Sequence, residues 1–457
     1  MSSEWPRFTV SQLQAEKKLL VEDGNHGEYR PRPDEFQDHG VSFIRAADMS
    51  DGRVLFNSAQ CISKLARSRI RKGIGLPGDV LLSHKGTVGK VAYVPEECPD
   101  FVCSPQTTFW RVLDEQTLNR SFLFAYLQSA EFKAQLASRK GETDMADYVS
   151  LTAQRQLQIP VPSISIQRAI GKTFSALNDR ITLLRETSAT LEATAQALFK
   201  SWFVDFAPVR AQAEGRQPEG MNVTAAALFP DSFEESELGL VPKGWGITSV
   251  AEVAEVVKGK SYTSKELAEA HDTALVTLKS FARGGGFRLD GFKPYTGSYK
   301  PTQVVVPGDL IIAYTDVTQA AELIGKPAIV IGVKDYQTLV ASLDVGVVRP
   351  DSKKVSRQYL YGLFRTDSFQ SHTFAHTSGT TVLHLAKDGV GSYRFSCPPN
   401  EIIQYFSVIT DVLSERCQNN IDQVRTLTQL RDTLLPRLIS GQLCLPDAEQ
   451  AVEKELA

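Results

Sequence analysis

A duplicated motif constrains the fold of this chain more than any other feature of its sequence. Leu-Pro-Gly-Asp-Val-Leu-Leu at 76–82 returns as Val-Pro-Gly-Asp-Leu-Ile-Ile at 306–312, a shift of 230 positions. Gly-Lys-Val-Ala-Tyr-Val at 89–94 returns as Gly-Lys-Pro-Ala-Ile-Val at 325–330, now shifted by 236 positions. Such self-similarity indicates that one structural plan occurs twice. With 457 residues the chain also exceeds the usual size of one hydrophobic core, so we expect at least two domains.

Each copy of the motif predicts a β-hairpin with a projecting tip. Proline fixes φ and glycine accepts positive φ, so Pro-Gly forms a turn and the apolar residues after it form a strand. The polar loop before Gly-Lys is then the tip of the hairpin, at Ser83–Thr87 in the first copy and Ala313–Gln319 in the second. The second loop is six residues longer. The frame is therefore repeated, whereas the tip differs.

A long helix is predicted after each strand-rich copy. Apolar or small residues recur in steps of three and four from Ile166 to Trp202, 37 residues that span roughly 55 Å as a helix. The pattern recurs 236 positions later, and a heptad seam of this length is typical of a coiled coil. Asn420 occupies the position of Leu184, where it either fixes the register of the seam or lies on an exposed stripe. The predicted seam residues are Leu177, Ile181, Leu184, Leu191, Leu198, Leu413, Asn420, Leu427 and Leu434.

These patterns predict an α+β protein with two strand-rich domains in tandem, separated by two long helices that pair as an antiparallel coiled coil. Residues 207–240 are rich in Ala, Glu, Pro and Gly, which favours a linker or a partly ordered connection rather than core. We expect a first strand-rich domain at 1–162, a first spacer helix at 163–206, this linker, a second strand-rich domain at 241–397, a second spacer helix at 398–440 and a mobile tail at 441–457.

The composition excludes several classes of protein. Apolar residues make up 42% of the chain and charged residues 23%, which excludes wholesale disorder. Lysine and arginine total 50 against 53 acidic residues, so any nucleic-acid site must be local. No apolar run approaches the roughly 18 residues that cross a bilayer, and no basic and apolar leader pattern opens the sequence. We therefore expect a soluble, cytoplasmic protein with no membrane partner.

The motifs that resemble cofactor or metal sites are incomplete. Gly73–Gly78 matches G-x-G-x-x-G, but a dinucleotide site needs a strand before it and a helix after it, whereas here a basic segment precedes and a strand follows. His372 and His376 have helical ligand spacing, but Thr373 replaces the glutamate of H-E-x-x-H. The six cysteines contain no Cys-x-x-Cys pair. We therefore expect no catalytic residue, no metal and no cofactor bound by this chain.

Local basic clusters accompany both hairpins. Only Asp79 is acidic between Lys64 and Lys90. A lone cluster usually just solvates a surface, but two clusters beside one repeated hairpin favour a face that binds phosphates. The second cluster also contains Arg288 and Lys293. The candidate DNA-binding residues are Lys64, Arg67, Arg69, Arg71, Lys72, Ser83, His84, Lys85, Thr87 and Lys90 in the first copy, and Lys279, Arg283, Lys300, Tyr314, Thr315 and Gln319 in the second.

Several segments resemble the specificity subunits of type I restriction-modification enzymes. The element Pro-Gly-Asp, strand, loop, Gly-Lys is similar to that of their target-recognition domains, and 157–162 with 198–206 resembles their first spacer helix. Val241–Trp245 resembles the opening of their second recognition domain, and Leu434–Gly441 their closing helix. The resemblance covers nearly the whole chain. It departs from the family pattern at Ile166, where the family often has glutamate.

The resemblance implies a non-catalytic subunit that reads double-stranded DNA, docks two methyltransferase subunits and recruits restriction subunits that translocate DNA. S-adenosylmethionine, ATP and Mg would bind to those partners. Because the two tips differ, the target would be bipartite and asymmetric, with the helices holding the readers about one duplex turn apart, roughly 34 Å. The alternative is a coiled-coil scaffold or adaptor protein whose basic clusters are ordinary surface. An enzyme acting on DNA would need cofactor or metal residues that the sequence does not offer.

Overall fold

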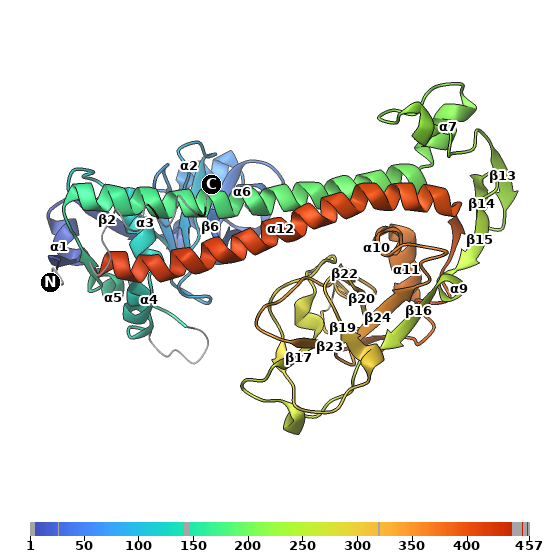
Figure 1. Ribbon diagram of the computed structural model, residues 1–457. Coiled ribbons are helices and arrows are strands. Elements are labelled where there is room, and N and C mark those ends of the chain that lie inside the picture. Colours follow the sequence, from blue (N-terminus) through green and yellow to red (C-terminus); the bar gives the residue numbers. More distant parts are fainter. Residues whose placement is uncertain are drawn as a thin grey trace. The chain divides into compact units, whose positions relative to one another are not determined.

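The computed structural model describes residues 5–25, 27–140, 147–318 and 320–440, together with 450 and 455. The chain forms two compact units, residues 1–185 with 422–457 and residues 186–421. Two helices of 40 residues each, α6 (Ile164–Phe203) and α12 (Asn400–Ile439), run through both units (Figure 1). Each unit therefore holds one strand-rich domain and one half of each long helix. The predicted mobile tail at 441–457 lies outside the described residues, apart from 450 and 455.

The first unit is built around a six-stranded sheet. Its strands and short helices are β1 (Arg7–Thr9), α1 (Val10–Ala15), β2 (Leu19–Asp23), β3 (Phe36–Gln37), β4 (Val41–Ile44), β5 (Met49–Ser50), β6 (Gly52–Val54), β7 (Cys61–Ile62), α2 (Lys64–Arg69), β8 (Val80–Ser83), β9 (Val91–Tyr93), β10 (Phe101–Cys103), β11 (Thr107–Val112), α3 (Arg120–Gln128), α4 (Ala130–Ala137), α5 (Leu151–Arg155) and β12 (Gln158–Pro160). The large sheet has the order β2-β11-β8-β9-β6-β5, and a second sheet has the order β10-β4-β7-β3. Strands β1 and β12 form a separate antiparallel pair.

The second unit contains smaller sheets. Its elements are α7 (Ala207–Ala213), α8 (Val223–Ala226), β13 (Phe233–Ser236), β14 (Gly239–Pro242), β15 (Gly246–Ser249), α9 (Val250–Val253), β16 (Ala254–Lys258), β17 (Thr273–Val276), β18 (Lys293–Pro294), β19 (Val304–Val305), β20 (Leu310–Ala313), β21 (Thr315–Asp316), β22 (Pro327–Ile329), β23 (Thr338–Ala341), β24 (Val345–Pro350), α10 (Arg357–Phe364), α11 (Asp367–Ala375), β25 (Thr377–Ser378), β26 (Leu383–Leu385) and β27 (Arg394–Cys397). Two four-stranded sheets have the orders β16-β24-β20-β22 and β18-β17-β23-β19.

The two units repeat one topology. The order β2-β11-β8-β9 corresponds to β16-β24-β20-β22, and the parallel pair β4–β10 corresponds to β17–β23. The helices α3 and α10 that follow are capped alike, because Asn119 Oδ1 accepts the Phe122 amide at 3.1 Å and Ser356 Oγ accepts the Tyr359 amide at 3.1 Å. The duplication predicted from the sequence is therefore confirmed.

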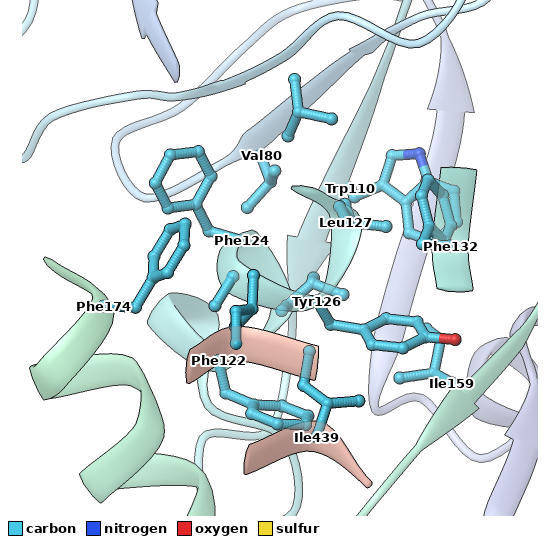
Figure 2. Close-up of a cluster of buried hydrophobic side chains, with 14 of the residues drawn as sticks. Val80, Trp110, Phe122, Phe124, Tyr126, Leu127, Phe132, Ile159, Phe174 and Ile439 are labelled. Carbon is cyan, nitrogen blue, oxygen red and sulfur yellow. The ribbon is translucent and has the colours of Figure 1, made fainter. Parts of the chain in front are cut away.

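The core of the first unit joins the large sheet to the long helices. Figure 2 shows aromatic side chains of α3 gathered between the sheet residue Trp110 and the helix residues Phe174 and Ile439. The rings of Phe124 and Phe174 meet edge to face with centroids 5.8 Å apart. Aromatic pairs of this kind add to the stability that burial provides. Helix α3 is thus fixed to α6 and α12, which positions the sheet on the helix pair.

The second unit uses α10 in the same way. Phe199 of α6 packs against Tyr359 of α10 and Phe406 of α12, with ring centroids 5.4 and 5.7 Å apart. Gly362 faces the Phe199 ring so closely that a Cβ there would lie 2.3 Å from it. The sheet of each unit therefore reaches the helix pair through one short helix, α3 in the first unit and α10 in the second.

The long helices pair in an antiparallel arrangement within each unit. In the first unit Arg431 Nη1 donates to Asn178 Oδ1 at 2.9 Å, and in the second Asn420 Nδ2 donates to Ser188 Oγ at 3.2 Å. Contacts thus move backward along α12 as they advance along α6, which confirms the predicted pairing. Asn420 is 1% exposed, so it is a residue of the buried seam and does not lie on an exposed stripe. No helix in the described ranges has a stretch apolar enough to cross a membrane.

The predicted seam is buried over most of its length and open at one place. Leu177, Ile181, Leu184, Leu427 and Leu434 are buried, whereas Leu191, Leu198 and Leu413 are half-buried. Leu198 and Leu413 are only half-buried because they line a cleft of about 510 Å³ in the second unit, together with Trp202, Met221 and Tyr405.

Residues 207–240 are ordered, in contrast to the linker that their composition predicts. They form α7, α8 and the hairpin of β13 and β14. Val209 and Phe229 are buried, and Phe229 meets the Trp202 ring edge to face with centroids 5.3 Å apart. Because buried apolar side chains, Val209 and Phe229 among them, anchor it, this segment belongs to the core of the second unit despite its composition.

Candidate nucleic-acid interface

The Pro-Gly-Asp motif holds the base of each hairpin in place. Arg111 on β11 donates to both carboxylate oxygens of Asp79 at 2.7 Å, and Asp79 Oδ2 also accepts the Leu76 amide at 2.8 Å. Burial raises the pKa of Asp79, and Arg111 opposes that effect. In the second unit Arg349 on β24 lies 2.6 Å from Asp309. The motif is therefore a structural clamp that leaves the hairpin free to vary beyond it.

Fewer side chains of the first tip are accessible than the sequence predicts. Lys85 and Thr87 are exposed, but Ser83 is fully buried and His84 is 3% exposed. Ser83 ends β8, where its Oγ accepts the Lys90 amide at 2.8 Å. His84 Nδ1 lies 3.1 Å from the Val149 carbonyl oxygen, and burial lowers the His84 pKa. Of the predicted tip, only the side chains of Lys85 and Thr87 are accessible to a ligand.

The Lys90 side chain has a structural role. Its Nζ donates to the carbonyl oxygens of Ala46 and Met49 at 2.8 and 3.0 Å. These carbonyls flank a short turn before β5, and the ammonium satisfies them both. The expected phosphate contact of Lys90 is thus replaced by a structural role.

The second tip continues into a small sheet of its own. Tyr314 and Thr315 are buried, and burial raises the pKa of Tyr314 to about 12. Strand β21 pairs with β26, so the six additional residues build a strand and a loop. Asp316 organises this loop by accepting the amides of Leu323 and Ile324 at 2.6 and 2.9 Å. Gln319 lies outside the described residues, so the predicted tip residues Tyr314 and Thr315 are interior and Gln319 is not placed.

A segment that was not among the predicted site residues pairs with each tip. Lys85 forms a β-bridge with Tyr148, and Thr315 pairs with His384. The backbone amide of Val149 donates to the His84 carbonyl at 2.9 Å, and that of Leu385 to the Tyr314 carbonyl at 2.9 Å. Tyr148 and His384 stand 236 positions apart, the shift of the duplication, which is the signal that could have identified them.

The basic residues of the first unit divide into paired and free cations. Arg67 Nε lies 3.2 Å from Asp100, and Arg69 lies 2.5 Å from Glu35, whose pKa it lowers to about 2. Four further lysines and arginines of the predicted set are exposed and make no ion pair with any described residue: Lys64, Arg71, Lys72 and Lys85. This division favours the free four as the side chains available to phosphates.

The second unit shows the same division. Arg283 lies 3.2 Å from Glu322 and Arg288 lies 2.5 Å from Asp290. Lys293 Nζ donates to the Tyr262 hydroxyl at 2.9 Å and stands over its ring. Lys279 and Lys300 are exposed and form no ion pair within the described ranges. They are the predicted cations of this unit that remain available.

The histidine pair His372 and His376 lies in no cluster of metal ligands in the part of the chain that the structure describes. Across the described residues, no group of three or more His, Cys, Asp or Glu side chains could hold a metal ion. His372 and His376 stack with ring centroids 4.1 Å apart, and His372 Nε2 lies 3.1 Å from Ser392 Oγ. Burial lowers the pKa of His372. This pair is explained by packing within the fold.

Comparison with known proteins agrees with this arrangement. Residues 26–193 match the family model described as the type I restriction modification DNA specificity domain. The chain is 24% identical over 464 aligned positions to the type I restriction enzyme HindI specificity subunit of Haemophilus influenzae. This alignment covers 88% of this chain and 94% of that protein. It is 22% identical to the MjaIX specificity subunit of Methanocaldococcus jannaschii, over 80% of this chain and 78% of that protein.

A solved structure shares the fold. The S subunit of a type I restriction-modification system from M. genitalium matches with a TM-score of 0.54 and 14% identity, covering 95% of this chain and 96% of that chain. The likeness covers nearly the whole chain, so the two proteins share a fold. The chain is thus similar to type I restriction-modification specificity subunits over most of its length, and residues 26–193 match the model of their DNA specificity domain.

Proposed function

We propose that this chain reads a bipartite, asymmetric DNA target, with one half-site assigned to each unit. The observation that carries this proposal is the repeated clamp and hairpin frame, which presents different tips. The clamps Asp79–Arg111 and Asp309–Arg349 hold equivalent strands. The accessible side chains beyond them differ, with Lys85 and Thr87 in the first unit and Val317 in the second. A reader of two unlike half-sites needs this combination of a constant frame and variable edge.

The long helices act in the proposal as a ruler between the half-sites. Each has 40 residues and is therefore roughly 60 Å long at about 1.5 Å per residue. The hydrogen bond between the buried Asn420 and the half-buried Ser188 favours a single register of the pair. A fixed register gives a fixed distance between the readers, which a defined gap in the target requires.

The chain itself supplies recognition, and partner subunits supply the chemistry. We expect two methyltransferase subunits that bind S-adenosylmethionine, and restriction subunits that use ATP and Mg. The relatives named above are specificity subunits, and this supports a non-catalytic role in the cytoplasm. Free cations such as Lys72 and Lys85 would hold phosphates and orient each unit on the duplex.

Genomic methylation read at base resolution tests the proposal. Cells that express the methyltransferase subunits with this chain should carry one methylation motif made of two unlike segments with a fixed gap. The same cells without the chain should lack that motif. A contiguous motif, or one that persists without the chain, would contradict the proposed function. A coiled-coil scaffold predicts no dependence of the motif on this chain.

A further inference from the structure

We infer that a second turn in each unit reads bases beside the hairpin tip, and that Gln106 and Asp344 determine specificity there. The turns are Ser104–Thr107 and Ser342–Val345. The inference deepens the proposed function and rests on it. It adds one residue per unit to a recognition edge that the basic clusters alone do not define.

The topology brings the first turn and the first tip to one edge of the sheet. Strand β11 is antiparallel to both β2 and β8, so the start of β11 lies beside the ends of the other two. The turn immediately precedes β11, and the tip immediately follows β8. The His84 amide donates to the Gln106 carbonyl at 2.9 Å, which joins the turn directly to the root of the tip.

The second unit repeats these contacts at equivalent places. The Tyr314 amide donates to the Asp344 carbonyl at 2.8 Å, as His84 does to Gln106. The amide of the fourth turn residue donates to the carbonyl of the first, at 3.0 Å in the first unit and 2.8 Å in the second. Ser104 and Ser342, the first residues of the turns, are both buried. The backbone frame of the turn is therefore kept between the units.

The side chains on this common frame differ in hydrogen-bonding capacity. Gln106 is exposed and Asp344 is half-buried, and neither side chain makes a hydrogen bond or ion pair with another described residue. A glutamine amide can bond both N6 and N7 of adenine, whereas a carboxylate accepts only, as from cytosine N4. A carboxylate is repelled by phosphate, so a base edge is the part of DNA that Asp344 suits. The same position thus offers two different base preferences in the two units.

Substitution in the full chain, expressed with its methyltransferase subunits, tests the inference. The variants are Gln106→Ala, Gln106→Glu and Asp344→Asn. Gln116, exposed beyond the other end of β11, gives the matched control Gln116→Ala, and Asp335, exposed before β23, gives Asp335→Asn. The readouts are the genomic methylation motif at base resolution and the salt dependence of duplex binding.

Gln106→Ala should reduce discrimination at one base pair of one half-site roughly 10-fold or more, and leave the other half-site and the salt dependence unchanged. Gln106→Glu should move the preference at that base pair toward a base that offers a donor. Asp344→Asn should alter one position of the other half-site, and both controls should keep the motif. An unchanged motif, or an even loss at all positions, would overturn the inference. A wild-type motif without two segments would contradict the proposed function instead.

Discussion

The division of the cations into free and paired groups predicts which of them set the salt dependence of DNA binding. Lys64, Arg71, Lys72 and Lys85 are the predicted DNA-binding cations of the first unit that are exposed and form no ion pair with a described residue. Each cation that neutralises a phosphate contributes about 0.9 to the slope of log affinity against log salt. If all four do so, this surface contributes a slope of roughly 3.6 and loses about 150-fold in affinity between 50 and 200 mM salt.

Replacing Arg71 and Lys72 together by alanine should halve that contribution. The slope should fall by about 1.8, so the affinity of the variant should decline about 12-fold less than that of the wild type over the same range of salt. Fluorescence anisotropy with a labelled duplex at 50, 100 and 200 mM salt would measure this difference. Both the change in slope and the 12-fold ratio compare the variant with the wild type. The cations of the second unit are the same in both proteins and therefore cancel.

The matched control is the double variant Arg67→Ala with Arg69→Ala. These guanidinium groups are already engaged by Asp100 and Glu35, at 3.2 and 2.5 Å. Their loss should leave the slope within experimental error of the wild type. An unchanged slope for the Arg71 and Lys72 variant, or an equal fall for the control, would refute the assignment of free cations to phosphates.

Three further predictions concern the frame that carries the tips. Phe124→Ala should lower the free energy of unfolding by about 3–5 kcal/mol in denaturant titrations, because it removes a ring packed against the long helices; a loss below 1 kcal/mol, of the order of a surface change, would contradict that packing. Asp79→Ala should cost about 3 kcal/mol because Arg111 loses its buried partner, whereas Asp100→Ala, at an exposed pair, should cost less than about 1 kcal/mol; equal losses would argue against the clamp. Burial lowers the pKa of His84, so the unfolded state binds more protons. Stability should therefore fall as the pH drops below about 6.5, and His84→Gln should reduce that dependence, as measured by unfolding at pH 7 and pH 5.

The duplication made much of the architecture predictable. The repeated Pro-Gly-Asp motif located both hairpins, and the heptad spacing placed helices from 166 to 202 and from 398 to 440, where the structure has 164–203 and 400–439. Those features depend on local turn chemistry and on periodicity, which a sequence displays directly. The heptad pattern itself fits a parallel or an antiparallel pair, and the contacts Arg431–Asn178 and Asn420–Ser188 show the antiparallel one.

The accessibility of the tip residues could not be predicted in this way. His84 is covered by the segment around Val149, which lies 65 positions further along the chain. The pairing of Arg67 depends on Asp100, 33 positions away. Whether a cation is free therefore depends on contacts between distant segments. The composition of residues 207–240 misled for a similar reason, since a few buried residues such as Val209 and Phe229 contribute little to a compositional average.

The distance between half-sites tests most directly whether the two long helices set the gap in the DNA target. One heptad inserted between Arg185 and Glu186, and another between Ile421 and Asp422, would lengthen both helices where one compact unit ends and the other begins. Contacts within each unit would be kept, and the added length of roughly 10 Å corresponds to about three base pairs. The methylation motif should keep the same two half-sites, and its gap should be longer by about three base pairs. An unchanged gap, or altered half-site sequences, would refute the role of the helices as a ruler.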